Sequence, residues 1–194
     1  MKLYLIRHGQ SVANLNKIHS GWGQFGLTEK GQEDARRAGQ LLEGVRFDAV
    51  YSSDLLRAME TQQLALPDAH AERSMLLREI NVGNLSGKPF EELYLELGEG
   101  YLEDRRLFDF SKYGGEVYEQ LYARIRSFLD FLEESEYESV AAFCHGGWIN
   151  TMIDVITGFR THRPQFKCEN GSISVFEFKD GAWALKLWNY TGKL

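Results

Sequence analysis

Proline, cysteine and long apolar runs are all scarce in this chain of 194 residues. Its three prolines, with 43% hydrophobic and 26% charged residues, exclude a fibrous or low-complexity protein and indicate a globular one. The two cysteines, Cys144 and Cys168, are too few for a disulfide framework and lack the spacing of metal ligands, which favours a reducing compartment. No apolar run reaches the ~18 residues of a membrane span, and no signal-like segment opens the sequence. We therefore expect a cytoplasmic protein with no membrane partner.

An excess of positive charge is also missing. The 22 Lys and Arg are outnumbered by 28 Asp and Glu, which gives a formal net charge of -6. Bulk attraction to nucleic acid or to an anionic membrane is therefore not expected, and any anionic ligand has to be held by a local basic cluster. The length of the chain favours a single domain over residues 1–194.

Apolar runs that fit strands alternate with helix-period segments, which is typical of an α/β domain. The three main strands are expected at residues 2–7, 48–52 and 139–144, and a helical pattern follows each of them. The clearest amphipathic helix covers about residues 116–132. We predict a three-layer α/β fold, with a mainly parallel central sheet and helices on both faces.

Cap and turn signals add detail to this prediction. Thr28 and Asp54 stand where each can cap the helix that follows it. Two alternating apolar runs near the end of the sequence flank Asp180-Gly181, which is a strong signal for a tight turn. We expect these runs to pair as an antiparallel C-terminal hairpin at the edge of the sheet.

The most informative motif is Arg7-His8-Gly9, which ends the first apolar strand. Arg offers a planar fork of donors suited to phosphate, and His can be an uncharged nucleophile near neutral pH. Ligands of open α/β sheets bind beyond the carboxyl ends of the parallel strands. The third strand brings His145 to that same edge, and the helix after the second strand carries Arg57. Two His and two Arg would repel one another there unless they enclosed a multiply charged anion, so we predict a phosphoryl-binding site.

Two glycines after His145 support an anion site. Gly146 and Gly147 leave backbone amides bare at the expected start of a helix, which is a position suited to an anion.

Further short motifs follow along the chain, and their order carries a family resemblance. They are Arg7-His8-Gly9, Asn14, Ser20-Gly21-Trp22, Leu27-Thr28-x-x-Gly31, Ser52-Ser53-Asp54-Leu55-x-Arg57-Ala58-x-x-Thr61, Leu77-Arg78-Glu79-Ile80-x-x-Gly83-x-x-x-Gly87 and His145-Gly146-Gly147. Each motif alone is weak, but the ordered set is specific and extends to the apolar run after Asn170. It resembles the histidine phosphatase superfamily, also called phosphoglycerate mutase-like.

The resemblance implies a reaction in which His8 attacks phosphorus and forms a phosphohistidine, which splits one slow hydrolysis into two easier steps. Glu79 would protonate the leaving oxygen and then deprotonate the attacking water. Preorganised donors would hold the equatorial oxygens, where transition-state charge is spread, and these are Arg7, Arg57 and His145. Asn14, Ser20 and the Gly21 backbone would line the phosphate pocket. This chemistry needs no metal and no organic cofactor.

Other interpretations of these residues are weaker. His8 alone could be a hydrogen-bonded core histidine, and Glu79 alone is unremarkable in so acidic a chain. Two histidines and a carboxylate could surround a metal ion, but the flanking arginines would repel a cation. Cys144 closes an apolar strand, so we expect it to be buried and unreactive. The remaining histidines are expected at the surface, namely His19, His70 and His162.

Residues 89–115 break the alternation of strands and helices, and mix a short helix-like stretch with glycines and aromatics. We expect a cap-like excursion over one end of the sheet, of the kind that commonly shapes substrate choice. A modest, partly apolar leaving group would suit its aromatics, which are Tyr94, Tyr101, Phe108, Phe110 and Tyr113.

The sequence favours hydrolysis over phosphotransfer between substrates. Ile80-Asn81-Val82 stand where the glycolytic mutases of the family carry Arg-His-Tyr, and the chain is shorter than those enzymes. A mutase must also hold a substrate carboxylate, for which only Lys88, Arg105 and Arg106 are candidates. We predict a phosphatase for a small phosphorylated metabolite, with mutase-type phosphotransfer as the alternative and a non-catalytic phosphate or phosphopeptide binder as a third possibility. The exposed faces of the terminal hairpin are compatible with a homodimer.

Overall fold

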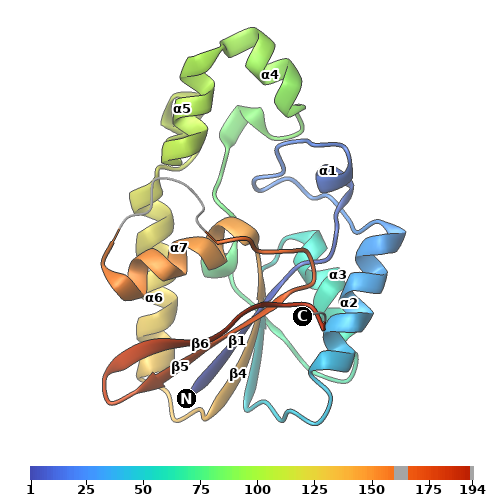
Figure 1. Cartoon of the computed structure of the whole chain (residues 1–194), viewed down its shortest axis with the longest axis vertical. Coiled ribbons are helices and arrows are strands. Elements are labelled where there is room, and N and C mark those ends of the chain that lie inside the picture. Colours follow the sequence, from blue (N-terminus) through green and yellow to red (C-terminus); the bar gives the residue numbers. More distant parts are fainter. Residues whose placement is uncertain (160–165, 193–194) are drawn as a thin grey trace.

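The computed structural model describes residues 1–159 and 166–192, and these form one six-stranded mixed sheet with helices on both of its faces (Figure 1). The strand order is β3-β2-β4-β1-β5-β6. The strands are β1 (Lys2–Arg7), β2 (Ala49–Ser52), β3 (Glu72–Arg73), β4 (Ser139–Cys144), β5 (Ile173–Lys179) and β6 (Ala182–Tyr190). The pairs among β1 to β4 are parallel, whereas β5 pairs antiparallel with both β1 and β6, so the predicted fold class is confirmed. His162 lies outside the described residues.

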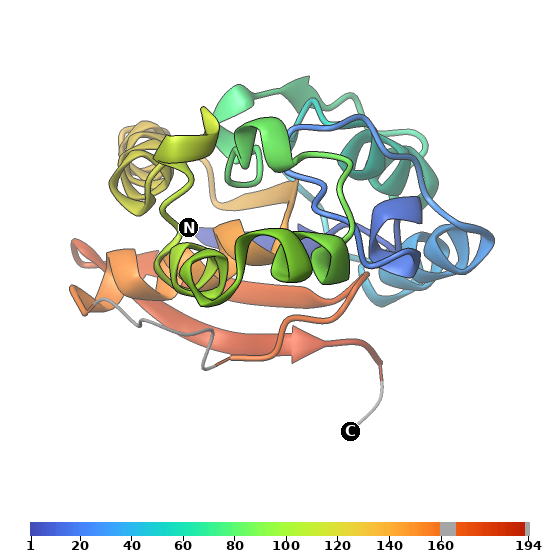
Figure 2. The same cartoon turned by 90° about the horizontal axis from the view of Figure 1, so that it is seen from above.

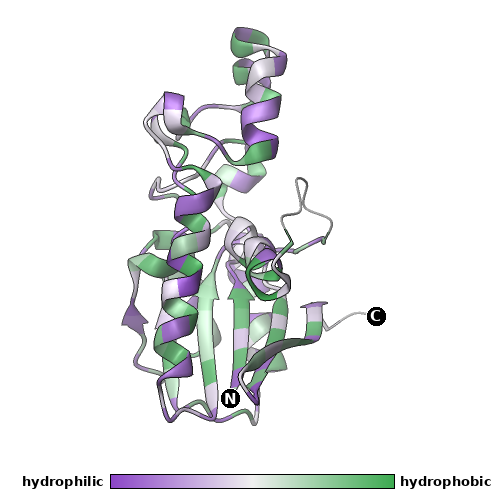
Figure 3. Cartoon of the chain, turned by 90° about the vertical axis from the view of Figure 1, so that its left-hand side faces the viewer, coloured by the Kyte–Doolittle hydropathy of each residue, from purple (hydrophilic) through white to green (hydrophobic). Residues whose placement is uncertain are grey.

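Strands β1 and β4 are buried on both sides because their apolar side chains alternate between two cores. Leu3 and Leu5 face one core, which is covered by α6 (Tyr118–Glu133) and α7 (Gly146–Thr157). Ile6 packs into the other core, which is covered by α2 (Glu29–Leu41) and α3 (Leu56–Ala65). Figure 3 shows hydrophobic residues concentrated along these central strands. Near-continuous apolar runs are what a sheet covered on both faces requires.

Residues 89–115 form two helices, α4 (Phe90–Leu97) and α5 (Glu99–Leu107), and the one-turn helix η3 (Ser111–Tyr113). Figures 1 and 2 show α4 and α5 beyond the carboxyl ends of β1 and β4. The remaining short helices are α1 (Val12–Leu15), η1 (Met75–Leu77) and η2 (Gly83–Leu85). Segments from distant parts of the chain therefore meet above one edge of the sheet.

The cap and turn predictions have different outcomes. The Thr28 side chain accepts a hydrogen bond from the Gly31 amide at the start of α2, as predicted. Asp180 and Gly181 both take left-handed φ values, 52° and 76°, and join β5 to β6 as the predicted tight turn. The capping role of Asp54 is wrong. Its carboxylate binds Arg78, with Arg78 Nε 2.7 Å from Oδ1, because an arginine distant in sequence offers a stronger partner than the helix amides.

In the described ranges, no helix combines the length and the apolar character that crossing a membrane takes.

Candidate active site

Two histidines meet where β1 and β4 end. His8 follows β1 and His145 follows β4, and their ring centroids are 5.2 Å apart. Arg57, from the first turn of α3, donates from Nε to His8 Nε2 at 3.3 Å. All three side chains are buried, with at most 3% of their surface exposed. The structure thus brings together the residues that the edges of the parallel strands predict.

The hydrogen bonds of His8 define its tautomer. Its Nδ1 lies 2.7 Å from the Gly9 carbonyl oxygen, which can only accept, so Nδ1 carries the proton. Nε2 then holds a lone pair, in agreement with the N–H that Arg57 directs at it. Burial, followed by the charges of Arg57 and Arg7, holds the pKa of His8 well below its usual 6.5. His8 is therefore neutral at pH 7 and has a nucleophilic nitrogen.

Two polar atoms beside His8 are buried and have no hydrogen-bond partner among the described residues. They are His145 Nδ1 and Arg7 Nε. The other ring nitrogen of His145 lies 2.9 Å from Ser53 Oγ, and another nitrogen of Arg7 donates to the Cys168 carbonyl. A side chain at Gly146 would place its Cβ 3.1 Å from Arg7 Nε. Since buried polar groups almost always have partners, these atoms fit the oxygens of a bound anion.

Arg57 also fixes the loop that was predicted to line the pocket. Its two terminal nitrogens donate to the carbonyls of Gly21 and Gly23, at 2.9 and 3.0 Å. Burial lowers the pKa of Arg57 to about 10, so the guanidinium stays charged at neutral pH. Gly21 has φ +42°, and a Cβ there would approach Val82 to 2.6 Å. Only glycine therefore fits this close approach between the loop and Val82.

Glu79 lies between η1 and η2 with its carboxylate held by backbone amides. Oε1 accepts from the Ile80 N–H and Oε2 from the Gly147 N–H, both at 3.0 Å. The prediction that both glycine amides after His145 stay open for an anion is therefore wrong for Gly147, because its amide donates to the Glu79 side chain. A Cβ on Gly147 would lie 2.3 Å from Oε1, so this contact requires glycine.

A cavity of about 700 Å³ opens beside these groups. Six predicted site residues line it, namely Arg7, Asn14, Ser20, Gly21, Glu79 and Gly146. Apolar residues also line it, namely Ile18, Ile80, Val82, Phe90, Phe108 and Phe110. His8, Arg57 and His145 are not in its lining, so the cavity adjoins the buried histidine pair and has both basic and apolar walls.

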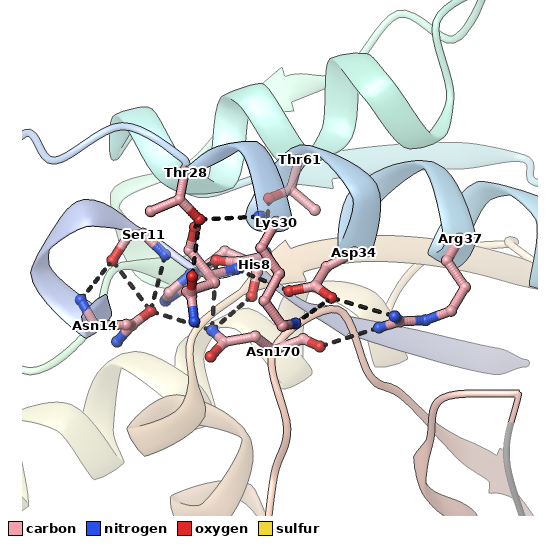
Figure 4. A network of polar contacts seen from close by, with 12 residues as sticks. His8, Ser11, Asn14, Thr28, Lys30, Asp34, Arg37, Thr61 and Asn170 are labelled. Carbon is pink, nitrogen blue, oxygen red and sulfur yellow. Dashed lines mark hydrogen bonds and ion pairs between the residues drawn. The ribbon is translucent and has the colours of Figure 1, made fainter.

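The backbone of residues 8–10 is held from behind by polar side chains (Figure 4). Asn170 Nδ2 donates to the His8 carbonyl at 3.1 Å and to Asn14 Oδ1 at 3.2 Å. Gly9 N–H donates to Thr61 Oγ1 at 3.0 Å, and Gln10 N–H to Asp34 Oδ2 at 3.2 Å. Sequence reasoning gave no role to Asp34 or Thr61, since a polar residue on a helix is ordinarily solvated. Together these contacts hold the backbone from which the His8 side chain extends.

His19 is buried, so its predicted surface position is wrong. Its Nε2 lies 2.7 Å from the Tyr101 hydroxyl, and its ring meets Phe90 edge-on with centroids 4.6 Å apart. These partners come from α4, which matches the predicted helix-like stretch, and from α5, which the sequence analysis did not predict. Burial, followed by the charge of Arg105, lowers the pKa of His19 to about 4.

Cys144 is buried, as expected, and burial raises the pKa of its thiol well above the usual value. The thiol is therefore protonated and unreactive at neutral pH. Among the described residues, no group of three or more His, Cys, Asp and Glu side chains is placed to hold a metal ion.

Three buried histidines make stability depend on pH. The pKa of His8, His19 and His145 lies below 6.5 in the folded chain, and near 6.5 in the unfolded chain. Below pH 6.5 the unfolded chain takes up protons that the folded chain does not, so acid favours unfolding. We expect the free energy of unfolding, measured by urea titration, to fall between pH 6.5 and 5 by up to about 1.4 kcal/mol per pH unit for each such proton.

A matched pair of variants tests this assignment. His19→Phe removes one of the three protons and should lessen the pH slope, whereas His70→Gln, at an exposed position, should leave it unchanged. An unchanged slope in His19→Phe would contradict the assignment.

Arg124 of α6 holds the segment that carries Glu79. Its guanidinium donates to the carbonyls of Leu76, Arg78 and Glu79 at 3.0–3.2 Å and pairs with Glu116 at 2.8 Å. A lone arginine on an amphipathic helix gives no such signal in the sequence.

We expect Arg124→Gln to lower kcat about 10- to 100-fold. The variant would let the segment that carries Glu79 shift, and a small displacement of a reacting group lowers the rate by about that factor. Arg126 lies on the same helix and pairs with Asp130, so Arg126→Gln is the control and should keep the wild-type kcat. Steady-state kinetics with matched urea titrations separate a loss of positioning from a loss of folding. Equal kinetics for the two variants would contradict the positioning role.

Comparisons with known proteins agree with this geometry. A family model described as the histidine phosphatase superfamily (branch 1) matches residues 3–191. A curated 2,3-bisphosphoglycerate-dependent phosphoglycerate mutase from Beijerinckia indica is 32% identical over 91% of this chain and 91% of its own. The structure of the α-ribazole phosphatase from Shigella flexneri superposes with a TM-score of 0.88, at 27% identity over 98% of this chain and 97% of that one. A mycobacterial glucosyl-3-phosphoglycerate phosphatase, in a complex with VO3, gives a TM-score of 0.87 at 25% identity over 97% and 98%.

Proposed function

Because the chain belongs to the histidine phosphatase superfamily, we propose that it is a phosphatase that hydrolyses small phosphomonoesters through a phosphohistidine on His8. The observation that carries this proposal is the neutral, buried His8 Nε2 beside the unpartnered Arg7 Nε and His145 Nδ1. A nucleophile without charge and two open donors suit a dianionic phosphoryl group. Ile80 and Val82, which follow Glu79 in the sequence and line the cavity, are apolar, which favours a leaving group without a carboxylate at this wall of the cavity.

In the first step His8 Nε2 forms a bond to phosphorus while the ester P–O bond breaks, and Glu79 gives its proton to the departing alcohol oxygen. Arg57 Nε already lies against Nε2, so the same donor can pass to a phosphoryl oxygen as phosphorus approaches. In the second step Glu79 takes a proton from water, the water oxygen bonds to phosphorus, and the N–P bond breaks. Inorganic phosphate leaves, and His8 is again neutral.

Phosphoglycerate mutase-type phosphotransfer is the second candidate, and relatives named as such mutases support it about as well. Arg105 favours it specifically, because this cation lines the cavity and forms no ion pair among the described residues. Arg106 pairs with Glu103, and Lys88 is exposed and does not line the cavity. Arg105 is therefore the one of the three predicted clamp residues that is positioned to meet a substrate carboxylate.

Two assays on the same preparation decide between the candidates. In the first, a panel of phosphomonoesters is compared by kcat/KM for phosphate release without any bisphosphoglycerate. In the second, 3-phosphoglycerate is supplied with catalytic 2,3-bisphosphoglycerate, and formation of 2-phosphoglycerate is followed. Phosphate release faster than isomerisation supports the phosphatase, and the reverse order supports the mutase. Phosphate binding without turnover in either assay would leave a non-catalytic binder.

A further inference from the structure

Phe108 has a backbone conformation that phenylalanine rarely adopts. It ends α5 with φ 55° and ψ 41°, in the left-handed region. Helices commonly end in this region with glycine, as α7 does at Gly158, because a Cβ is unfavourable there. A bulky residue with positive φ is uncommon and persists only where its surroundings impose it, often at a ligand site.

The Phe108 side chain lines the cavity of the candidate active site. Four non-glycine residues with positive φ occur in the described part of the chain, and two of them, Lys17 and Phe108, line this one cavity. Phe108 is half-buried, packs against the main hydrophobic core and lines the same cavity as Glu79. Of the five aromatics that the sequence suggested for this purpose, the structure brings Phe108 and Phe110 to the cavity.

The surroundings of Phe108 define what can bind against it. Ile80, Val82 and Phe110 supply apolar surface in the same cavity, and Phe110 is nearly fully buried at 1% exposure. Among the residues that the structure describes, Glu79 is the one acidic residue on the lining, against the basic residues Arg7, Lys17, Arg105 and Lys167. A cationic leaving group is therefore disfavoured. The volume of about 700 Å³ exceeds what a phosphate with a two- or three-carbon alcohol fills, and lies in the range of pockets that bury drug-sized ligands.

We propose that Phe108 is a specificity-determining residue, and that the substrate is a phosphomonoester whose leaving group carries an uncharged apolar ring packed against the Phe108 side chain. This inference rests on the proposed phosphatase function and specifies its substrate class. The ring stacks on or meets the edge of Phe108, while the phosphoryl group lies at His8. Glycine is the residue that usually ends a helix in this conformation. A glycine at position 108 would remove the apolar surface of the Phe108 side chain.

Two esters with alcohols of similar acidity test the inference, because they share the same chemistry and differ in the ring. They are 2-phenylethyl phosphate and ethyl phosphate. The wild-type chain should show a kcat/KM about 10- to 100-fold higher for the phenylethyl ester, which corresponds to burying one apolar side chain of that size. Phe108→Gly should reduce this ratio about tenfold or more. The conservative variant Phe108→Tyr should keep the wild-type ratio.

A matched control is available in the hairpin turn. Asp180 has φ 52°, is exposed and does not line the cavity, so Asp180→Gly relieves the same conformation without touching the site. It should leave the ratio unchanged. Thermal unfolding of each variant reports separately on its folding. The ratio of the two kcat/KM values does not depend on the fraction of active enzyme, because both esters are assayed on the same preparation.

The outcomes are distinguishable. Hydrolysis of both esters at equal kcat/KM, or an unchanged ratio in Phe108→Gly, overturns the inference and leaves the phosphatase function standing. Hydrolysis of neither ester overturns the proposed function and the inference with it. A ratio that falls in both Phe108→Gly and Asp180→Gly would assign the effect to the fold and would also overturn the inference.

Discussion

Replacing His8 by alanine is expected to lower the rate of phosphate release by roughly 10,000-fold or more, as removal of a covalent nucleophile does in other enzymes. Arg7, Arg57 and His145 remain in the variant and would still bind phosphate under the proposed mechanism, so the loss is expected to fall on kcat. The alanine removes a neutral, buried nitrogen that lies next to the Arg57 guanidinium. The Gly9 and Asn170 contacts of the same segment involve the backbone and persist.

Rapid quenching in alkali, where phosphohistidine survives, should trap label from a radioactive ester on the wild-type chain and none on His8→Ala. His70→Ala, at an exposed position away from the cavity, is the matched control and should keep both label and turnover. More than a few per cent of wild-type activity in His8→Ala would exclude the phosphohistidine mechanism.

The convergence of Arg7, His8 and His145 was predictable from the sequence. Long apolar runs identify strands buried on both sides, and parallel strands end at one sheet edge, so residues that follow two such runs must meet. Register makes this concrete, because Arg7 pairs with Cys144, the residue before His145. The apolar pattern of each strand and the topology of the sheet give the same prediction for these residues. No contact from outside the two strands is needed to make it.

Contacts that depend on the fold of connecting segments were not predictable. His19 is buried against Tyr101, which lies 82 positions further along the chain. The Asp54 side chain binds Arg78 instead of capping the helix that follows it. The Gly147 amide binds Glu79 rather than remaining open. In each case a polar group has several possible hydrogen-bond partners. Which partner it meets depends on the conformation of a loop, and the loop's sequence has no periodic pattern from which that conformation could be predicted. The left-handed Phe108 is the extreme example, since its residue type argues against its conformation.

The charge of the chain and the charge of the site have opposite signs, and this has a consequence for catalysis. The net charge of -6 disfavours anions at the surface, whereas Arg7 and Arg57 meet two histidines in a buried pocket. Because the histidines are kept neutral, the cations are not opposed by further positive charge. The proposed attraction for a phosphoryl group would therefore be short in range and little screened by salt, unlike that of a surface patch.

Replacing Glu79 by glutamine is expected to lower kcat about 100- to 10,000-fold for esters of weakly acidic alcohols, which need a proton on the leaving oxygen. The amide can neither give nor take that proton at neutral pH. It also cannot accept from both the Ile80 and Gly147 N–H groups, so urea titration has to show that the variant is folded. Glu43→Gln, at an exposed position, is the control and should behave as wild type.

The two roles of Glu79 separate with p-nitrophenyl phosphate, whose leaving group needs no proton. With this ester the first step should remain fast in Glu79→Gln, while the second step is slow because no carboxylate deprotonates the water. The variant should then release about one equivalent of p-nitrophenol in a burst and accumulate phosphohistidine on His8. In the wild-type chain, where both steps keep their carboxylate, no such accumulation is expected. Equal losses for both esters without a burst would assign the proton transfer to another group and leave Glu79 as a structural anchor for the Gly147 amide.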